Sequence, residues 1–262
     1  LTKGYRSCIK KRCVKGSLFA SVVRVFSMKF HKLIHVYDGV YAFITPSEFL
    51  KQKLSANGFE EEKIHCIPTF TASKTKVGEP QIGSYGLYFG RITEEKGVET
   101  VVQAYEKLQK YTVKIMGDDT TEEAIRLKRY IKEHKIKNIE FLGFKSGEEL
   151  EDIIKGARFT LIPSIWYDNL PNTALESFQY SKPVIASNIG SLPELVVDGE
   201  NGYLFKPADA EDLIKKIKLL DDDTVVEKMG AASRRRLESR FSPETHYEAL
   251  MKVFSEAVKN NK

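Results

Sequence analysis

The chain has 262 residues, 42% of them hydrophobic, which is enough for one full core but short for two complete domains. No run approaches the roughly 20 uninterrupted apolar residues of a membrane-spanning helix, and no secretory signal peptide is recognisable. We therefore expect a soluble, cytoplasmic chain, trimmed at its start because the first residue is Leu1. Its three cysteines are an odd number without metal-site or redox-pair spacing, which favours structural thiols.

The net charge of +5 is unevenly distributed, because the segment before Asp38 contains nine Lys or Arg residues and no acid. Apolar residues recur in this segment at roughly helical spacing: Leu18, Phe19, Val22, Val23, Phe26, Phe30 and Leu33. A basic amphipathic segment is typical of peripheral binding to an anionic membrane, here the inner face of the plasma membrane. A buried apolar stripe with solvated charges is the alternative, and nucleic acid is not the expected partner.

Before the main sheet, the pattern predicts a strand over 40–45, a helix over 47–57 and a strand over 64–67. These elements are too few for an independent sheet covered by helices. We therefore expect residues 1–70 to be the remnant of an N-terminal acceptor-binding domain. The polar stretch 71–84 has two glycines and a proline and predicts an interdomain linker.

From residue 85 onward, apolar β-rich runs alternate with amphipathic helical runs, as in an α/β domain. A short strand over 203–205 and further helices follow, the last over 242–262. The pattern predicts a Rossmann-like parallel sheet with helices on both faces over 85–241. The expected strands are 85–89, 112–116, 139–142, 159–162 and 183–186, and the expected helices between them are 98–109, 122–134, 148–155 and 173–180.

Ligands of open parallel sheets bind beyond the carboxyl ends of the strands, which directs attention to the loops there. The loop over 90–97 begins and ends with Gly90 and Gly97, precedes a helix and holds Arg91 and Lys96. Glycines let the backbone approach a ligand, helix N-termini favour anions, and the two cations complete a diphosphate cradle. The alternative is a surface loop with a solvated charge pair. The loop is neither a dinucleotide fingerprint nor a triphosphate-binding motif.

The loop over 164–172 contains Asp168 and leads into a helix that holds Glu176. Pro171 disfavours a continuous helix between the two acids on steric grounds, so both carboxylates can face one ligand. A carboxylate accepts hydrogen bonds from ribose or hexose hydroxyls. The alternative places Glu176 at the start of the helix, where an acid complements the helix dipole.

In this order, Arg91 with Lys96, Asp168 with Glu176, the run Lys182-Pro183-Val184-Ile185-Ala186 and the run Gly190-Ser191-Leu192-Pro193-Glu194 resemble glycosyltransferase family 4. The resemblance implies the GT-B architecture of two facing Rossmann-like domains. It also implies that Arg91 and Lys96 bind the donor diphosphate, Glu176 the ribose and Asp168 the sugar. In the family's signature of two acids the first is Glu, and Asp168 is one methylene shorter.

The resemblance therefore implies a retaining, hexosyltransferase-type enzyme of polysaccharide biosynthesis that transfers a sugar from a nucleotide diphosphate sugar to a glycan or lipid-linked acceptor. Catalysis is expected from Asp168, Arg91 and Lys96. Because cationic side chains neutralise the diphosphate, neither a metal nor another cofactor is expected, although Asp118-Asp119 and the acids over 221–223 are alternative metal ligands. The donor-binding set is Gly90, Arg91, Lys96, Asp168, Asn169, Leu170, Pro171, Asn172 and Glu176.

No segment matches the Gly-rich acceptor loop or the sugar-contacting His of the family's N-terminal domain. The chain is therefore expected to bind a donor but to transfer negligibly by itself. One alternative is a non-catalytic nucleotide-sugar-binding subunit completed by a partner protein. Another is a nucleotide-sugar epimerase of the same architecture.

Overall fold

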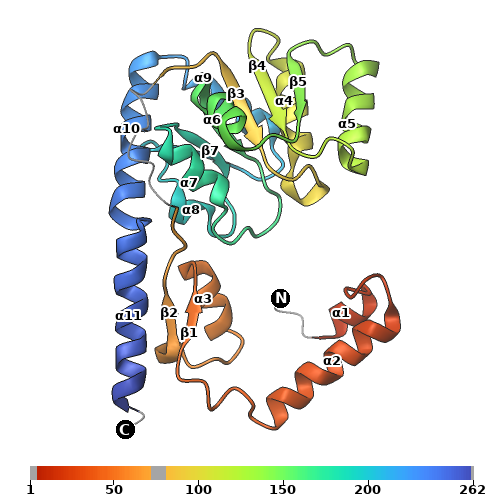
Figure 1. The fold of residues 1–262 in the computed structure, drawn as a ribbon. Coiled ribbons are helices and arrows are strands. Elements are labelled where there is room, and N and C mark those ends of the chain that lie inside the picture. The colour runs from red at the N-terminus through yellow and green to blue at the C-terminus, as the bar shows by residue number, and fades with distance from the viewer. Residues whose placement is uncertain (1–4, 72–80, 261–262) are drawn as a thin grey trace. The chain divides into compact units, whose positions relative to one another are not determined.

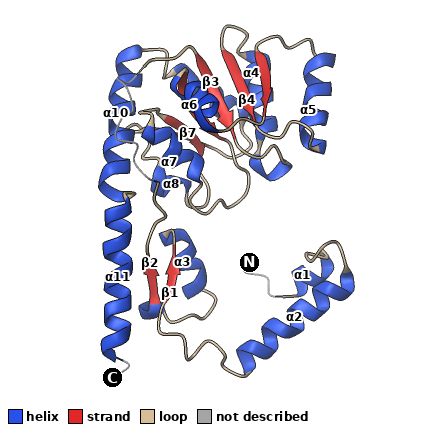
Figure 2. Cartoon of the chain, in the orientation of Figure 1, coloured by secondary structure: helices blue, strands red, loops and turns tan. Residues whose placement is uncertain are grey.

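The computed structural model describes residues 5–71 and 81–260 (Figures 1 and 2). The predicted linker over 71–84 lies mostly outside the described residues. The chain divides into two compact units, Leu1–Phe43 and Ile44–Lys262. Within the described ranges, no helix is long and apolar enough to cross a membrane. The domain boundaries expected from the sequence stay a prediction.

The smaller unit consists of α1 (Arg6–Lys10) and α2 (Leu18–Leu33). Ser17 begins α2 as its N-cap, because its hydroxyl accepts the N–H of Ala20. Ser21 and Val25 are buried on one side of α2. The apolar residues that recur in α2 at roughly helical spacing are exposed, from 43% at Val22 to 79% at Phe19, which differs from the alternative of a buried stripe.

The larger unit opens with a small two-stranded sheet. Its strands are β1 (Phe43–Thr45) and β2 (Ile64–Cys66), with α3 (Glu48–Ser55) and the 3-10 helix η1 (Glu61–Lys63) between them. The strand predicted over 40–45 begins only at Phe43. The N–H of Val40 donates to the carbonyl of Tyr37 in a turn, which delays the extended conformation.

A six-stranded sheet, parallel throughout, forms the body of the larger unit in the order β5-β4-β3-β6-β7-β8. This is the strand order of the doubly wound nucleotide-binding fold, and it reverses direction between β3 and β6. The predicted Rossmann-like sheet is confirmed. The strands are β3 (Tyr85–Phe89), β4 (Thr112–Met116), β5 (Ile139–Gly143), β6 (Ala157–Ile162), β7 (Val184–Ser187) and β8 (Gly202–Phe205).

Helices cover both faces of this sheet because its strands bury side chains in both directions (Figure 1). Tyr88 of β3 packs in the core beneath α4, α5 and α9, whereas Leu87 and Phe89 of the same strand point to the opposite face near α6. The helices are α4 (Val98–Lys107), α5 (Glu122–Glu133), α6 (Gly147–Lys155), α7 (Asn172–Gln179), α8 (Leu192–Leu195), α9 (Ala210–Lys218) and α10 (Asp223–Arg240), with the 3-10 helix η2 (Glu94–Lys96) before α4.

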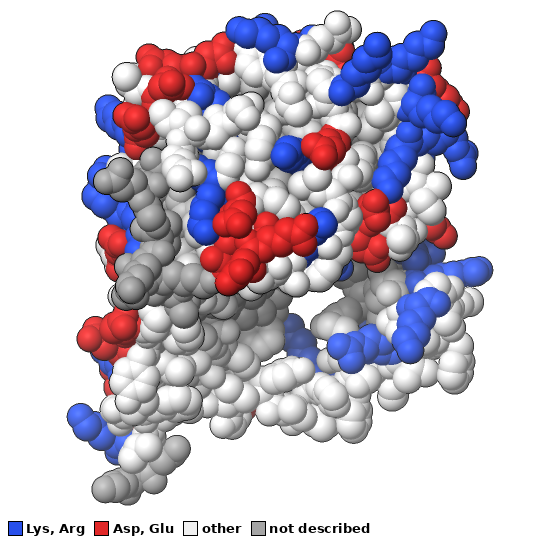
Figure 3. All heavy atoms as spheres, turned by 45° about the horizontal axis from the view of Figure 1, so that its top comes forward, with Lys and Arg blue, Asp and Glu red and all other residues white. Residues whose placement is uncertain are grey.

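The last helix, α11 (Pro243–Asn260), returns to the first residues of the larger unit. His246 Nδ1 lies 2.7 Å from the carbonyl oxygen of Pro68, and its ring lies 4.9 Å from that of Phe70. Figure 1 shows α11 running beside β2. On the face drawn in Figure 3, acidic and basic side chains are interspersed over the larger unit.

One lysine, Lys182, is buried just before β7. Lys182 is 2% exposed, and its ammonium donates to the carbonyls of Gln81 and Lys155, each at 2.6 Å. Burial lowers the pKa of Lys182 to about 8. Lys182 therefore ties the segment that enters β3 to the end of α6.

Candidate active site

The two predicted ligand loops follow β3 and β6, which are neighbours at the point where the strand order reverses. Gly97 has a φ of +66°, and a Cβ atom there would lie 2.1 Å from the carbonyl oxygen of Pro163. Glycine is therefore required for the first loop to pass so close to the second. The N–H of Ile165 also donates to the carbonyl of Glu95 at 3.0 Å, which joins the loops.

Lys96 and Asp168 come together where these loops meet. The ammonium of Lys96 donates to Oδ1 of Asp168 at 2.5 Å, and the two side chains are only 18% and 15% exposed. The hydroxyl of Ser164 donates to the other carboxylate oxygen. Both oxygens of Asp168 are therefore held before any ligand binds.

Arg91 lies on the same loop as Lys96 but points into solvent. Its side chain is 74% exposed, and its ion pair with Glu95 spans 4.0 Å. Its backbone is anchored, because Tyr88 donates its hydroxyl to the Arg91 carbonyl at 2.5 Å. The guanidinium is therefore weakly engaged while the backbone beneath it is fixed.

The residues after Asp168 are shaped by Ser191, whose hydroxyl donates to the Asp168 carbonyl at 2.7 Å and accepts the N–H of Leu170 at 2.8 Å. Leu170 has a φ of +56°, an uncommon conformation for a residue with a Cβ. Pro171 is the N-cap of α7, and Asn172 is its first residue. The bend that Ser191 supports separates Asp168 from the helix.

Glu176 lies in the second turn of α7, and the first turn contains no acid. The alternative in which Glu176 complements the start of the helix is therefore wrong. Burial raises the pKa of this carboxyl, and none of the described residues forms a hydrogen bond or ion pair with it. A half-buried carboxylate that lacks a partner within the described chain is available to accept hydrogen bonds from the hydroxyl groups of a ligand.

Ser164 and Ser191 were not assigned a role from the sequence. Ser191 belongs to the run Gly190-Ser191-Leu192-Pro193-Glu194, which carries the resemblance but gives no contact by itself. The structure gives a reason for the glycine at the start of that run, Gly190. With a φ of +64°, it passes close to the second loop, and a Cβ there would lie 3.2 Å from the Asp168 carbonyl oxygen.

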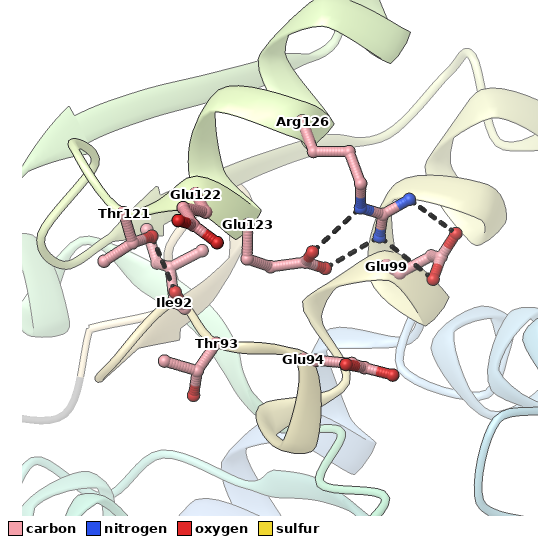
Figure 4. A pocket seen from close by; sticks show the side chains of 8 residues that line it. All are labelled: Ile92, Thr93, Glu94, Glu99, Thr121, Glu122, Glu123 and Arg126. Atoms are coloured by element: carbon pink, nitrogen blue, oxygen red, sulfur yellow. Dashed lines mark hydrogen bonds and ion pairs between the residues drawn. The ribbon is translucent and has the colours of Figure 1, made fainter. Parts of the chain in front are cut away.

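A pocket of about 710 Å³ lies between the first loop and the start of α5 (Figure 4). Figure 4 shows Arg126 held between Glu99 and Glu123, with nitrogen–oxygen distances of 3.1 and 2.8 Å. Four glutamates line this pocket, and its one basic lining residue is already paired. The pocket therefore suits a diphosphate poorly, and the two loops at the strand ends remain the candidate site.

The acids considered as metal ligands have other partners. Asp118 accepts from Thr120, Asp119 pairs with Lys128, and Asp222 caps α10 by accepting the N–H of Thr224. Over residues 5–71 and 81–260, no group of three or more His, Cys, Asp or Glu side chains is arranged to hold a metal ion. That donor binding needs no metal stays a prediction.

The structure resembles solved glycosyltransferases. It superposes on a glycosyltransferase from Rickettsia africae with a TM-score of 0.77 and 22% identity, over 86% of this chain and 67% of that one. It superposes on Anabaena HepE, solved in complex with UDP and glucose, with a TM-score of 0.73 and 18% identity, over 82% and 63%. These likenesses show the GT-B glycosyltransferase fold.

Sequence relatives agree. An uncharacterised glycosyltransferase of Methanocaldococcus jannaschii is 28% identical over 66% of this chain and 48% of its own length. A Mycobacterium tuberculosis glycogen synthase is 28% identical over 74% of this chain and 46% of its own length, so the chain spans about half the length of these relatives. Residues 70–236, more than half of the chain, match the family Glycosyl transferases group 1, and the chain therefore belongs to this family.

Proposed function

We propose that this chain binds a nucleotide diphosphate sugar where the loops after β3 and β6 meet, as the donor-binding half of a retaining glycosyltransferase of family 4. The Lys96–Asp168 pair carries the proposal, because it joins the two loops at the reversal of strand order. The exposed guanidinium of Arg91 on the first loop supplies a second cation.

Arg91 and Lys96 would hold the diphosphate and stabilise the negative charge that grows on it as the sugar departs. The guanidinium of Arg91 can bind two phosphate oxygens at once. The ammonium of Lys96 has three N–H donors and gives one of them to Asp168, so it can serve the carboxylate and a phosphate together. Two cations in these positions replace a divalent metal in the proposed site.

The carboxylates would hold the remaining parts of the donor. Glu176 is half-buried and has no partner within the described chain, which suits an acceptor for ribose hydroxyls. Asp168 would contact the sugar, with Asn169 and Leu170 beside it and Gly90, Pro171 and Asn172 shaping the loops. Because a hydroxyl bonded to a carboxylate is a charge-assisted contact, each of these bonds also adds specificity.

A hexose donor is supported by proteins with the same fold, since Anabaena HepE was solved in complex with UDP-glucose. A glycan or lipid-linked molecule is the proposed acceptor. The test is titration of the full chain with UDP, GDP and ADP sugars by calorimetry. We expect one donor class to bind, with affinity that requires the diphosphate. If none binds, the proposed function is wrong.

We also propose that the smaller unit docks on an anionic membrane surface on the cytoplasmic side. The supporting observation is α2, where Phe19, Phe26 and Leu33 are between 70% and 79% exposed on a helix without acidic residues. Apolar side chains would enter the headgroup region while nearby Lys and Arg contact lipid phosphates. A lipid-linked acceptor would lie at the same surface.

A further inference from the structure

The N-terminus of α3 is capped by a residue far along the chain. The N–H groups of Glu48 and Phe49 donate to the two carboxylate oxygens of Glu194 at 2.8 and 2.7 Å, and the N–H of Leu50 donates to the hydroxyl of Ser47 at 3.2 Å. The first-turn N–H groups, which have no partner inside a helix, are thereby satisfied. An anion is also favoured at this end of the helix dipole. Glu194 therefore fixes where α3 begins.

Ser47 connects this capped helix end to the candidate site through Asn169. Its side chain is fully buried, and its hydroxyl lies 2.7 Å from Oδ1 of Asn169. Since the hydroxyl oxygen already accepts from Leu50, its single proton is available for Asn169. A proton directed at Asn169 makes the carboxamide present its oxygen to Ser47. The amide nitrogen then points away from Ser47, and among the described residues it has no hydrogen-bond partner.

The same helix also contacts the loop on the other side of Asp168. The rings of Phe49 and Tyr167 lie 5.1 Å apart, and the ammonium of Lys53 lies 5.2 and 5.7 Å from their centroids. Helix α3 therefore holds the residues that precede and follow Asp168. These contacts join segments that lie more than 110 positions apart in the sequence. Ser47 and Asn169, for example, are separated by 122 positions.

We propose that Ser47 is a positioning residue for the donor loop. Its hydroxyl, held in place by the Glu194 cap, orients the Asn169 carboxamide so that Nδ2 donates to an oxygen of the nucleotide sugar. The inference rests on the proposed function and adds to it a direction for one hydrogen bond. It also assigns Glu194 a role, because loss of this cap would release Ser47.

The experiment compares nucleotide-sugar affinity of four variants by calorimetry. Ser47→Gly removes the hydroxyl, yet glycine is itself among the favoured N-cap residues, so α3 should still form. Ser47→Thr keeps the hydroxyl and should bind like the wild type. Asn169→Ala removes the amide, and Ser47→Gly/Asn169→Ala closes a double-mutant cycle. The control is Asp222→Gly, which removes the N-cap of α10.

We expect Ser47→Gly to weaken binding roughly three- to tenfold, the range for one hydrogen bond. In the Asn169→Ala background, Ser47→Gly should cause no further loss, because its effect passes through that amide. Asp222→Gly should leave affinity unchanged. Equal affinity of Ser47→Gly and the wild type, or additive losses in the double variant, would overturn this inference alone. A wild type that binds none of the UDP, GDP and ADP sugars would overturn the proposed function and this inference with it.

Discussion

The ammonium of Lys96 lies 2.5 Å from a carboxylate oxygen of Asp168, although the two residues are 72 positions apart. Asp168 is also bonded by Ser164, so its carboxylate is fixed between a cation and a hydroxyl. Removing one partner of a largely buried ion pair leaves an uncompensated charge. The pair therefore couples the stability of the two loops to the diphosphate binding proposed for them.

Lys96→Ala is expected to lower both stability and diphosphate affinity, each by about 1–3 kcal/mol. Changing Asp168→Asn as well should restore part of the free energy of unfolding, because the uncompensated charge is gone, but none of the diphosphate affinity. Urea unfolding and calorimetry measure the two quantities. Lys128→Ala is the control, since Lys128 pairs with Asp119 at the same distance of 2.5 Å but outside the loops. Full recovery of affinity in the double variant would contradict a direct contact with phosphate.

Arg91→Ala is expected to separate these two effects. Its guanidinium is 74% exposed with an ion pair of 4.0 Å, so the substitution should leave the free energy of unfolding nearly unchanged. Diphosphate affinity should fall by about 1.5–3 kcal/mol, while a nucleoside without phosphates binds both forms equally. Arg126→Ala, in the acidic pocket, should not alter diphosphate affinity. Unchanged affinity in Arg91→Ala would show that the cradle is wrongly assigned.

The sheet was predictable from sequence because its central strands, such as β3 and β6, bury side chains on both faces and so appear as short apolar runs. A strand begins later than predicted where a local hydrogen bond forms a turn, as the Val40 N–H does with the Tyr37 carbonyl before β1. Lys96 and Asp168 were each predicted as ligand contacts, but their mutual bond was not, because only the strand order brings the two loops together. The sequence did not predict the contacts of Ser47 and Glu194 on which their proposed roles rest. A serine before a helix predicts an N-cap but not the residue that its proton meets.

Glu176→Gln is expected to change stability and binding in opposite directions. Burial raises the pKa of this carboxyl above its ordinary 4.5, so the native state binds more protons than the unfolded state between 4.5 and the raised value. Wild-type stability therefore falls as pH rises through that window, and the loss is complete above it. At pH 7 Glu176→Gln should be the more stable protein, with the difference vanishing near pH 4.

Nucleotide-sugar affinity of Glu176→Gln should fall, because a carboxamide offers one acceptor oxygen where the carboxylate offers two. Urea unfolding at several pH values and calorimetry at pH 7 measure the two effects. A variant that loses stability at pH 7 and retains its affinity would mean that Glu176 has a structural role.

Lys182 should produce a stability change at alkaline pH. Its pKa falls to about 8 in the native state against 10.5 when unfolded, so the unfolded state binds more protons in that interval. Wild-type stability relative to Lys182→Met should therefore rise from pH 8 to 10.5. The neutral amine still has two N–H groups for the carbonyls of Gln81 and Lys155. Unfolding in urea at pH 7 to 10 tests this, with the exposed Lys252→Met as control.

The exposed face of α2 makes the membrane proposal testable with matched phenylalanines. Phe19 and Phe26 are 79% and 70% exposed on α2, and Phe144 is 75% exposed in the larger unit. The substitution Phe19→Ser/Phe26→Ser should weaken association with anionic vesicles, whereas Phe144→Ser should not. Co-sedimentation with phosphatidylserine-containing and purely phosphatidylcholine vesicles measures both contributions.

Varying the salt concentration distinguishes the electrostatic contribution to vesicle binding from the apolar contribution. Each Lys or Arg near an anionic surface contributes about 1 kcal/mol, and this contribution is screened within a Debye length of about 10 Å at 0.1 M salt. Association of the wild type should therefore fall as salt rises, whereas burial of Phe19 and Phe26 is much less sensitive to salt. Equal binding to neutral vesicles would rule out the electrostatic contribution. Equal binding of Phe144→Ser and the α2 variant would mean that α2 is not the docking surface.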